Sequence, residues 1–279
     1  MTASACVCVC AETYYILDGF TYRELDYGVS ISGWDYSSDV LRIPQLLGGE
    51  RVVAIDDFAF YKDDGVTAVD FSNASYLTTI GKMAFCASGL TGELELTPSI
   101  NSIGVGAFQG CSGVTSVVLN ANTDLIPNQC FKDCVNLSEI EILAPVSKIG
   151  AYAFQNCASL ESITLNKYIT SIDATAFQND DIILNVYKDT YAHQYAVENK
   201  IDHIVLDGYG LGDVNGDGVV DILDASEIQK YAAESTDFTD EQFELGDINK
   251  DGYCDVIDAL LVQKSVIGAY EIPQNIIRY

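Results

Sequence analysis

A unit of about 23 residues recurs six times through the middle of the chain, and it constrains the fold more than any other feature. Its anchor is Ile-Gly-x-x-Ala-Phe, and successive phenylalanines are 25, 23, 23, 23 and 23 residues apart. One such unit cannot bury its apolar face alone, so the copies must stack and share a core. The anchor phenylalanines are Phe60, Phe85, Phe108, Phe131, Phe154 and Phe177. The isoleucines five residues before them are Ile55, Ile80, Ile103, Ile126, Ile149 and Ile172.

Each unit also predicts one short β-strand. Apolar residues follow the phenylalanine at nine and eleven positions, and such a pair puts both side chains on one face of a strand. The pairs are Val69/Phe71, Leu94/Leu96, Val117/Leu119, Ile140/Ile142 and Ile163/Leu165. The sixth unit keeps only the first position of the pair, at Val186. At the usual strand separation of ~4.8 Å, six coils predict a parallel sheet roughly 25–30 Å long.

Three cysteines repeat with the same period, each three residues after a phenylalanine: Cys111, Cys134 and Cys157. A disulfide needs two cysteines with close Cα atoms and converging Cβ vectors, and three in a row cannot all pair. We therefore expect a ladder of small buried thiols at the turn before the strand. Further core or near-core thiols are expected at Cys86, Cys130 and Cys254.

This repeat resembles the BspA-type bacterial leucine-rich repeat. The resemblance implies a leucine-rich-repeat solenoid of parallel β-strands with coils of about 23 residues. The solenoid spans residues 51–206, and this range includes its closing cap. The flanks also resemble the ends of that family. Residues 12–50 predict a β-rich N-terminal cap of hairpin strands, and residues 186–206 predict a strand, a short helix and a final strand.

A twelve-residue acidic loop occurs twice near the C-terminus, at 213–224 (DVNGDGVVDILD) and at 247–258 (DINKDGYCDVID). In both copies loop positions 1, 3, 5, 9 and 12 are Asp or Asn, position 6 is Gly and position 8 is apolar. This is the EF-hand calcium-loop pattern, except that the last position is Asp instead of Glu. Helical spacing follows each loop, at 225–233 and 259–267, whereas no helix leads into the first loop.

A duplicated loop followed by a helix, with Asp at position 12, resembles a type I dockerin, here over residues 212–270. The resemblance implies a small all-α calcium-binding module of two loop-helix F-hand motifs. It also implies two calcium ions as folding cofactors and, as partner, the cohesin module of a scaffoldin. In that family, loop positions 1, 3, 5, 7, 9 and 12 surround the ion. The implied ligands are Asp213, Asn215, Asp217, Val219, Asp221 and Asp224, and Asp247, Asn249, Asp251, Tyr253, Asp255 and Asp258.

In dockerins the choice of partner resides largely at loop positions 10 and 11 and on the helix residues after them. The implied cohesin-binding residues are Ile222, Leu223, Gln229 and Lys230, and Val256, Ile257, Gln263 and Lys264. Because the two copies are so alike, either helix is able to occupy the cohesin after a half turn of the module. The alternative is that the aliphatic residues serve the module's own core, which Ala225, Ile228 and Leu260 are also able to supply.

The net charge of −27, from 41 acidic and 14 basic residues, excludes nucleic acid and anionic membranes as partners, since both require basic patches. No apolar run approaches the length of a membrane span. Residues 1–11 resemble the tail of a signal peptide, without its positively charged start, and favour a secreted, extracellular protein in a cellulosome or at a cell surface. A metal-binding interpretation of Cys6, Cys8 and Cys10 stays open.

Two classes of function remain. The first is a non-catalytic cellulosome component whose repeats bind a protein or a glycan. The second is a carbohydrate-active hydrolase with an unrecognised active site in the repeat region. His193 and His203 have no sequence partner that indicates a triad or a metal site. The strand face offers a ligand surface or, alternatively, a solvated acidic face, at Glu93, Glu95, Glu139 and Glu141.

The predicted order along the chain follows from these motifs. It is a signal-peptide remnant (1–11), the β cap (12–50), the repeats with their closing cap (51–206), a short linker (207–211), the dockerin (212–270) and a tail (271–279).

Overall fold

A computed structural model describes residues 13–35, 40–178, 181–188, 190–206, 211–216, 219–270 and 272. The expected signal-peptide remnant, with Cys6, Cys8 and Cys10, lies outside these residues, as do most of the expected linker and tail. The chain divides into two compact units. One comprises residues 1–161 and 172–182, and the other comprises residues 162–171 and 183–279. In the described part of the chain, no helix has the length and apolarity that crossing a membrane requires.

The first unit begins with a small antiparallel sheet that covers the first coil, as the sequence predicts. Its strands are β1 (Tyr14–Leu17), β2 (Phe20–Leu25) and β3 (Gly28–Trp34), with β5 (Leu46–Leu47) beside β6 (Glu50–Ile55). β3 then pairs in parallel with β6, which aligns Ile31 with Ile55 and passes the chain from the cap into the repeat. Alternation along the hairpin buries Phe20, Tyr22 and Trp34 on its inner face.

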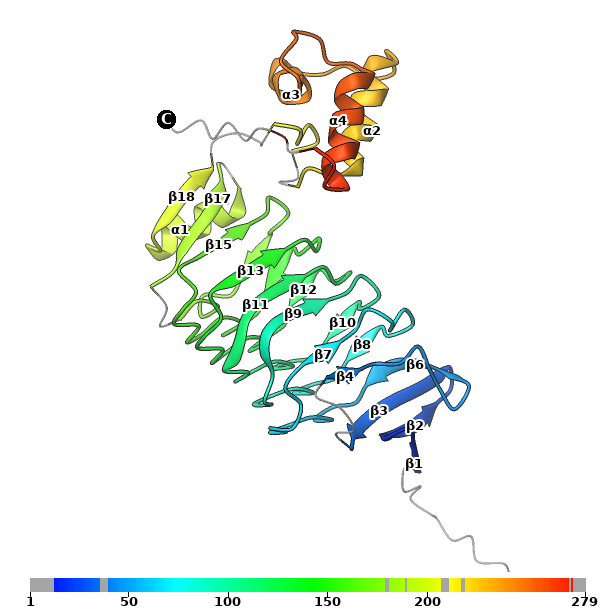
Figure 1. Ribbon diagram of the computed structural model, residues 1–279. Helices are drawn as coiled ribbons and strands as arrows, with labels where there is room; N and C mark the ends of the chain where they lie inside the picture. Colours follow the sequence, from blue (N-terminus) through cyan, green and yellow to red (C-terminus); the bar gives the residue numbers. More distant parts are fainter. Residues whose placement is uncertain are drawn as a thin grey trace, which may run out of the picture. The chain divides into compact units, whose positions relative to one another are not determined.

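The repeats form two series of parallel strands (Figure 1). One series, which includes the longer strands, is β4 (Leu41–Arg42) beside β7 (Val69–Asp70), then β9 (Thr91–Leu96), β11 (Gly113–Leu119) and β13 (Glu139–Ile142). The other series consists of two-residue strands: β8 (Thr79–Ile80), β10 (Ser102–Ile103), β12 (Leu125–Ile126), β14 (Lys148–Ile149) and β16 (Ser171–Ile172). Leu94, Val117 and Ile140 are in register, which confirms the predicted parallel pairing of the apolar positions.

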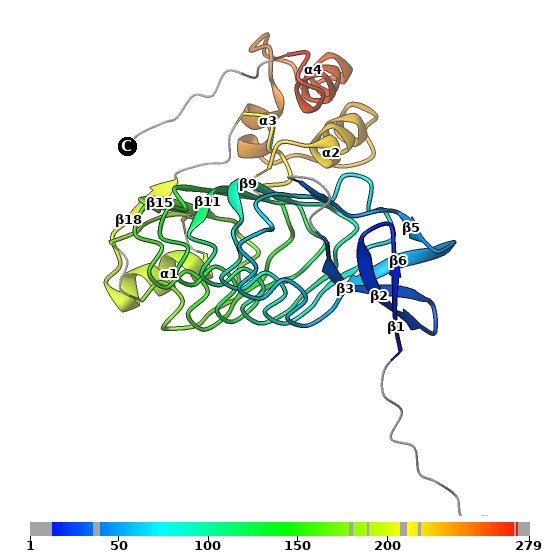
Figure 2. The same cartoon turned by 60° about the horizontal axis from the view of Figure 1, so that its bottom comes forward.

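The side of each coil opposite the longer strands is a series of tight turns (Figure 2). Their backbone N–H groups donate to carbonyls of the next coil: Phe85 to Ala107 at 2.8 Å, and Phe131 to Ala153 at 2.9 Å. The turns of the first five units have left-handed residues two positions before and two after their phenylalanines. The first set is Phe58, Met83, Gly106, Gln129 and Tyr152, and the second is Lys62, Ala87, Gly110, Asp133 and Asn156. The turns are therefore held by the neighbouring coil.

The anchor phenylalanines form the centre of the solenoid. The first five are almost completely buried, and Phe177 is buried as well. Successive rings from Phe60 to Phe177 lie 5.1, 5.5, 5.8, 5.7 and 5.5 Å apart and are stacked. These separations are typical of favourable offset stacking. Each coil therefore contributes one ring to a continuous column.

The cysteine ladder has the predicted character of buried free thiols. Cys111, Cys134 and Cys157 each donate from Sγ to the carbonyl of the phenylalanine one coil earlier, at 3.1, 3.2 and 3.2 Å. Burial raises the pKa of the Cys111 thiol to about 12. Cys86, Cys130 and Cys254 are also buried and free, as predicted. These thiols serve as packing groups of the core.

The second unit starts with the end of the repeats. Its strands β15 (Ser162–Leu165), β17 (Ile183–Tyr187) and β18 (His203–Leu206) are parallel, with helix α1 (Tyr191–Asn199) between the last two. This confirms the predicted strand, helix and strand of the closing cap. The position of Val186 was predicted wrongly. Val186 aligns with Leu165, the second apolar position, and Leu184 takes the first, because this coil is two residues shorter.

Three further helices follow the cap: α2 (Ile222–Ala232), α3 (Asp240–Gly246) and α4 (Val256–Val266). They share a small core in which Ala225, Ile228, Ala259 and Val262 are fully buried. α3 begins with a capping box, since Thr239 and Gln242 bond to each other's backbone N–H groups at 3.2 and 3.1 Å. The fold is therefore a leucine-rich-repeat solenoid followed by a small all-α region.

Replacing Phe108 with Ala should destabilise the repeat region by about 3–5 kcal/mol, because it leaves a hole in the middle of the ring column. Urea unfolding of the full chain measures the effect. The exposed residue Val135, replaced with Ala, is the matched control and should change stability by less than about 0.5 kcal/mol. Equal effects of the two substitutions would contradict the column as the source of stability.

Candidate functional site

The two acidic loops end in carboxylates that also start the helices. Asp221 caps α2, where its Oδ1 accepts from Leu223 N at 2.6 Å, and Asp224 Oδ2 accepts from Asp221 N at 2.9 Å. Asp255 and Asp258 repeat this arrangement at α4, with distances of 2.7 and 2.9 Å. The loop positions 9 and 12 therefore form a capping box in each copy. This explains why a helix follows each loop immediately.

The second loop closes around its own carboxylates. Asp247 accepts from Asp251 N at 3.1 Å and from Gly252 N at 2.9 Å. Asp258 Oδ1 accepts from Ile248 N at 2.9 Å and from Asn249 N at 3.2 Å. Burial raises the pKa of Asp258, although these backbone N–H donors act in the opposite direction. The carboxylates at loop positions 1 and 12 therefore organise the loop from inside.

The first loop has the same internal bond in its described part. Asn215 N donates to Asp224 Oδ1 at 3.0 Å, just as Asn249 N donates to Asp258 Oδ1 in the second loop. Asp213 and Asp224 are buried. Asp217, an expected ligand, and the adjacent Gly218 lie outside the described residues.

The donor types in both loops fit calcium. They are carboxylate, amide and backbone oxygens, which are the groups that a hard divalent cation prefers. Among the described residues of the module, buried carboxylates stand at Asp213, Asp224, Asp247 and Asp258. Buried carboxylates are costly unless a cation or hydrogen bonds stabilise them. Within the described residues, however, no three acidic, histidine or cysteine side chains already converge on one point. The chemistry of the loops suits the ion, while the side-chain oxygens are engaged with backbone N–H groups.

The expected partner-binding aliphatic residues lie at the surface. Ile222 and Leu223 at the start of α2 are 54% and 57% exposed, and Val256 and Ile257 at the start of α4 are 63% and 52% exposed. The core is supplied by other residues on the opposite sides of these helices. The interpretation that these aliphatics serve only the module's core is therefore not supported.

One expected core residue is also at the surface. Leu260 is 46% exposed, and Ala259 and Val262 occupy the core of α4 in its place. The polar residues expected beside the aliphatics are Gln229, Lys230 and Lys264, which are exposed, and Gln263, which is half-buried. Lys230 is paired with Glu227 at 2.7 Å. An apolar patch with polar side chains around it is the usual composition of a protein interface.

The four glutamates expected on the strand face are exposed and form two rows. Ser116 stands between Glu93 and Glu139 in the sheet register, and Val118 stands between Glu95 and Glu141. Glutamates of one row are therefore two strands apart, roughly 10 Å at the usual strand spacing. The arrangement spreads negative charge over the exposed face of the sheet.

The structure brings together two histidines that the sequence does not connect. The rings of His193 in α1 and His203 in β18 have centroids 5.5 Å apart, and His203 Nδ1 is 2.9 Å from the carbonyl of Ile201. Sequence reasoning also missed a cavity beside the N-terminal cap, which is described below. Asp56, Asp57, Phe58 and Ala59 belong to the anchor of the first unit, whereas the other lining residues come from the hairpin, which the repeat does not include.

Two family models match the chain. The BspA type leucine rich repeat region matches in six copies over residues 53–183. The dockerin type I domain matches residues 211–267. The chain therefore carries BspA-type leucine-rich repeats and a type I dockerin, as the sequence motifs indicate. Both are interaction modules, and type I dockerins are calcium-binding modules whose partners are cohesins.

Several solved structures are similar to the chain. A leucine rich cell surface protein from Faecalibacterium prausnitzii is 19% identical, with a TM-score of 0.44, over 60% of this chain and 52% of that chain. A leucine-rich repeat protein from Bacteroides ovatus is 17% identical, with a TM-score of 0.35, over 63% and 66%. One from Eubacterium ventriosum is 22% identical, with a TM-score of 0.43, over 58% and 50%. The chain thus spans about half to two thirds of these proteins. No curated protein matches it.

Replacing Leu223 with Ala should leave the stability of the helical module within about 0.5 kcal/mol, because the side chain is mostly exposed. Replacing Ile228 with Ala, one turn and a half further along the same helix, should cost about 2–5 kcal/mol. Thermal unfolding followed by far-ultraviolet circular dichroism compares the two variants. A large loss for Leu223→Ala would place that residue in the core after all.

Proposed function

We propose that the chain is a non-catalytic component of an extracellular cellulosome, which its dockerin attaches to the cohesin module of a scaffoldin. The observation that supports this most is the pair of exposed aliphatic residues at the start of each duplicated helix. By the resemblance to dockerins these side chains occupy positions that contact cohesins, and they are exposed, whereas the described core of the module is built from other residues. A secreted location fits calcium-dependent docking outside the cell.

We further propose that each acidic loop holds one calcium ion, so that the module binds two. The ligands would be the twelve residues at loop positions 1, 3, 5, 7, 9 and 12 given above, with position 7 contributing its carbonyl. Calcium would place positive charge beside the buried carboxylates and would fix both loops. Asp221, Asp224, Asp255 and Asp258 would then link the ion directly to the start of a helix.

The cohesin contact would be made by one helix at a time. Ile222 and Leu223 correspond to Val256 and Ile257 after a shift of 34 residues, and the Gln-Lys pairs correspond as well. The two faces are not identical, since exposed Leu260 in α4 stands where α2 has Ser226. The apolar patch on α4 is therefore larger, which favours the orientation that places α4 against the cohesin.

The repeats would present the working surface of the protein to a protein or glycan. The exposed strand face with Glu93, Glu95, Glu139 and Glu141 suits a basic or strongly polar partner, because the charge is spread over neighbouring strands and faces solvent. Such a complex would weaken with added salt, since exposed charges are screened.

Replacing both Asp213 and Asp247 with Ala removes position 1 from each loop. The double variant should bind neither calcium ion and should lose the helical signal of the module, because metal binding and folding are coupled. Isothermal titration calorimetry should give two ions per chain for the unaltered protein, one for each loop. Asp237→Ala, an exposed acidic residue between the loops, is the matched control and should bind normally. Unchanged helicity and calcium binding in the double variant would contradict the ligand assignment.

The cohesin surface is tested by charge substitution on one helix or on both. The pair Ile222→Asp and Leu223→Asp should lower affinity for a type I cohesin only slightly, because α4 still binds. The pair Val256→Asp and Ile257→Asp should lower it more, and all four together by about 100-fold or more. Asp is tolerated in the first turn of a helix, so folding should persist.

Surface plasmon resonance against a panel of type I cohesins measures these affinities, with circular dichroism as the folding control. Unaltered affinity of the fourfold variant would show that the contact lies elsewhere. Complete loss from a single pair would show that only one orientation binds.

A further inference from the structure

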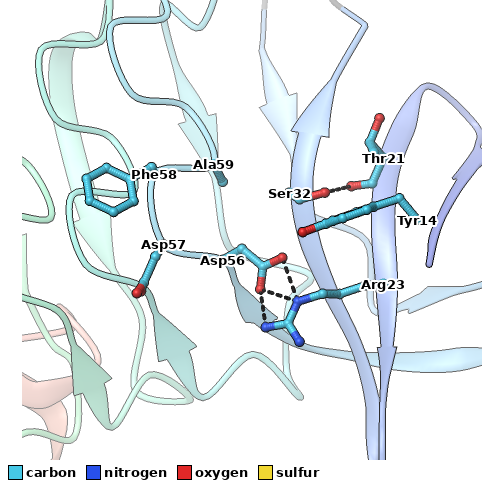
Figure 3. Close-up of a pocket in the computed structure, with 8 residues that line it drawn as sticks. All are labelled: Tyr14, Thr21, Arg23, Ser32, Asp56, Asp57, Phe58 and Ala59. Atoms are coloured by element: carbon cyan, nitrogen blue, oxygen red, sulfur yellow. Dashed lines mark hydrogen bonds and ion pairs between the residues drawn. The ribbon is translucent and has the colours of Figure 1, made fainter. Parts of the chain in front are cut away.

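A cavity of about 660 Å³ lies between the N-terminal hairpin and the first coil of the repeats. Its volume is in the range in which proteins hold small molecules. Figure 3 shows the residues of the hairpin on one wall and those of the coil on the other. The lining residues are Tyr14, Thr21, Arg23, Ser32, Asp56, Asp57, Phe58 and Ala59.

The hairpin wall is the polar face of an amphipathic sheet. Alternation along β2 buries Phe20 and Tyr22 on the inner face and turns Thr21 and Arg23 to the other. Tyr14 is the cross-strand partner of Arg23 in β1, so its ring belongs to the same face. The wall therefore combines an aromatic ring, a hydroxyl group and a guanidinium group.

Two ionic groups of the cavity, Arg23 and Asp56, are paired with each other. Arg23 Nε lies 3.0 Å from both carboxylate oxygens of Asp56, and its Nη2 lies 2.8 Å from Asp56 Oδ1. The buried Ser30 donates to the same oxygen at 2.6 Å. This fork-shaped pair joins the hairpin to the coil and carries no net charge. It offers a rigid set of donors and acceptors to a ligand.

Phe58 gives the coil wall an exposed aromatic rim. It is 47% exposed and has a φ of 60°, a left-handed conformation that disfavours bulky side chains. Other coils carry Met83, Gly106, Gln129 and Tyr152 at this position. The Phe58 ring meets the exposed Tyr61 edge-on at 5.9 Å. Lys82 Nζ lies 5.9 Å from the centroid of the same ring, and nearly half of the side chain remains exposed at the edge of the cavity.

These features together select a class of ligand. An anion is disfavoured, because Arg23 is neutralised by Asp56 and Asp57 adds negative charge to a chain of net charge −27. A purely apolar ligand is disfavoured by the hydroxyl and ionic groups of the walls. A sugar has an apolar C–H face that packs on an aromatic ring and adjacent hydroxyls that match fixed donors and acceptors. We propose that this cavity is a binding site for a neutral oligosaccharide.

This site is separate from the docking surface, so its test does not depend on cohesin binding. The full chain, with calcium present, is titrated by calorimetry with three probes: cellohexaose, xylohexaose and mannohexaose. At least one should bind saturably, and Phe58→Gly should weaken it by about tenfold or more. Glycine is chosen because it accepts the left-handed backbone, which keeps the turn intact.

Tyr152→Gly is the matched control, because Tyr152 has a φ of 57° at the same position of a distant coil and lies outside the cavity. It should leave oligosaccharide binding unchanged, whereas Tyr14→Ala on the hairpin wall should weaken it as Phe58→Gly does. The proposal would be overturned if none of the three probes bound at a concentration of about 10 mM. Equal binding by Phe58→Gly and Tyr152→Gly would overturn it as well.

Discussion

Each coil of this protein completes its hydrogen bonds and its apolar core on the next coil, and the rest of the repeat region depends on this. The turn N–H groups of one coil donate to carbonyls of its neighbour, and the phenylalanine column runs through the stack. Since a coil has no stable form alone, the stack needs structures of a different kind at its ends. A hairpin sheet at the start and a strand–helix–strand at the end meet that need.

The N-terminal cap shows how such an end creates a site. The hairpin joins the stack through β3 and β6 but is not itself a coil, so the two surfaces do not fit closely everywhere. The ion pair between Arg23 and Asp56 holds them together where they separate. A cavity with fixed polar groups and an exposed aromatic rim follows from this mismatch.

In the helical module, the last carboxylate of each loop has two structural roles. Asp224 and Asp258 end the loops and also complete the capping boxes of α2 and α4. The loop and the helix are therefore one cooperative unit. Because the core of the module is small, a bound cation would have a large effect on its stability. The exposed aliphatic residues remain available for a partner.

Periodicity predicted most of the fold, since spacings of 23 and 34 residues fix which positions are equivalent. The shared core, the thiol ladder and the loop-to-helix transitions follow from it, whereas both caps were expected from the resemblance of the flanks to the ends of the family. The prediction failed where a copy departs from the period, as at Val186 in a shortened coil and at Leu260, which differs from its counterpart Ser226. The cavity at Tyr14, Arg23 and Phe58 could not be predicted, because it arises from residues that meet only in three dimensions.

The central claim is that a calcium-folded docking module is joined to repeats that fold without the ion. Hydrogen–deuterium exchange of the full chain, with calcium and with a chelator, tests both halves in one experiment. Calcium should slow exchange by orders of magnitude in residues 211–267, while residues 53–183 exchange at the same rate in both conditions. The account would be contradicted if the exchange rate of residues 211–267 did not depend on calcium, or if the repeats exchanged faster after calcium was removed.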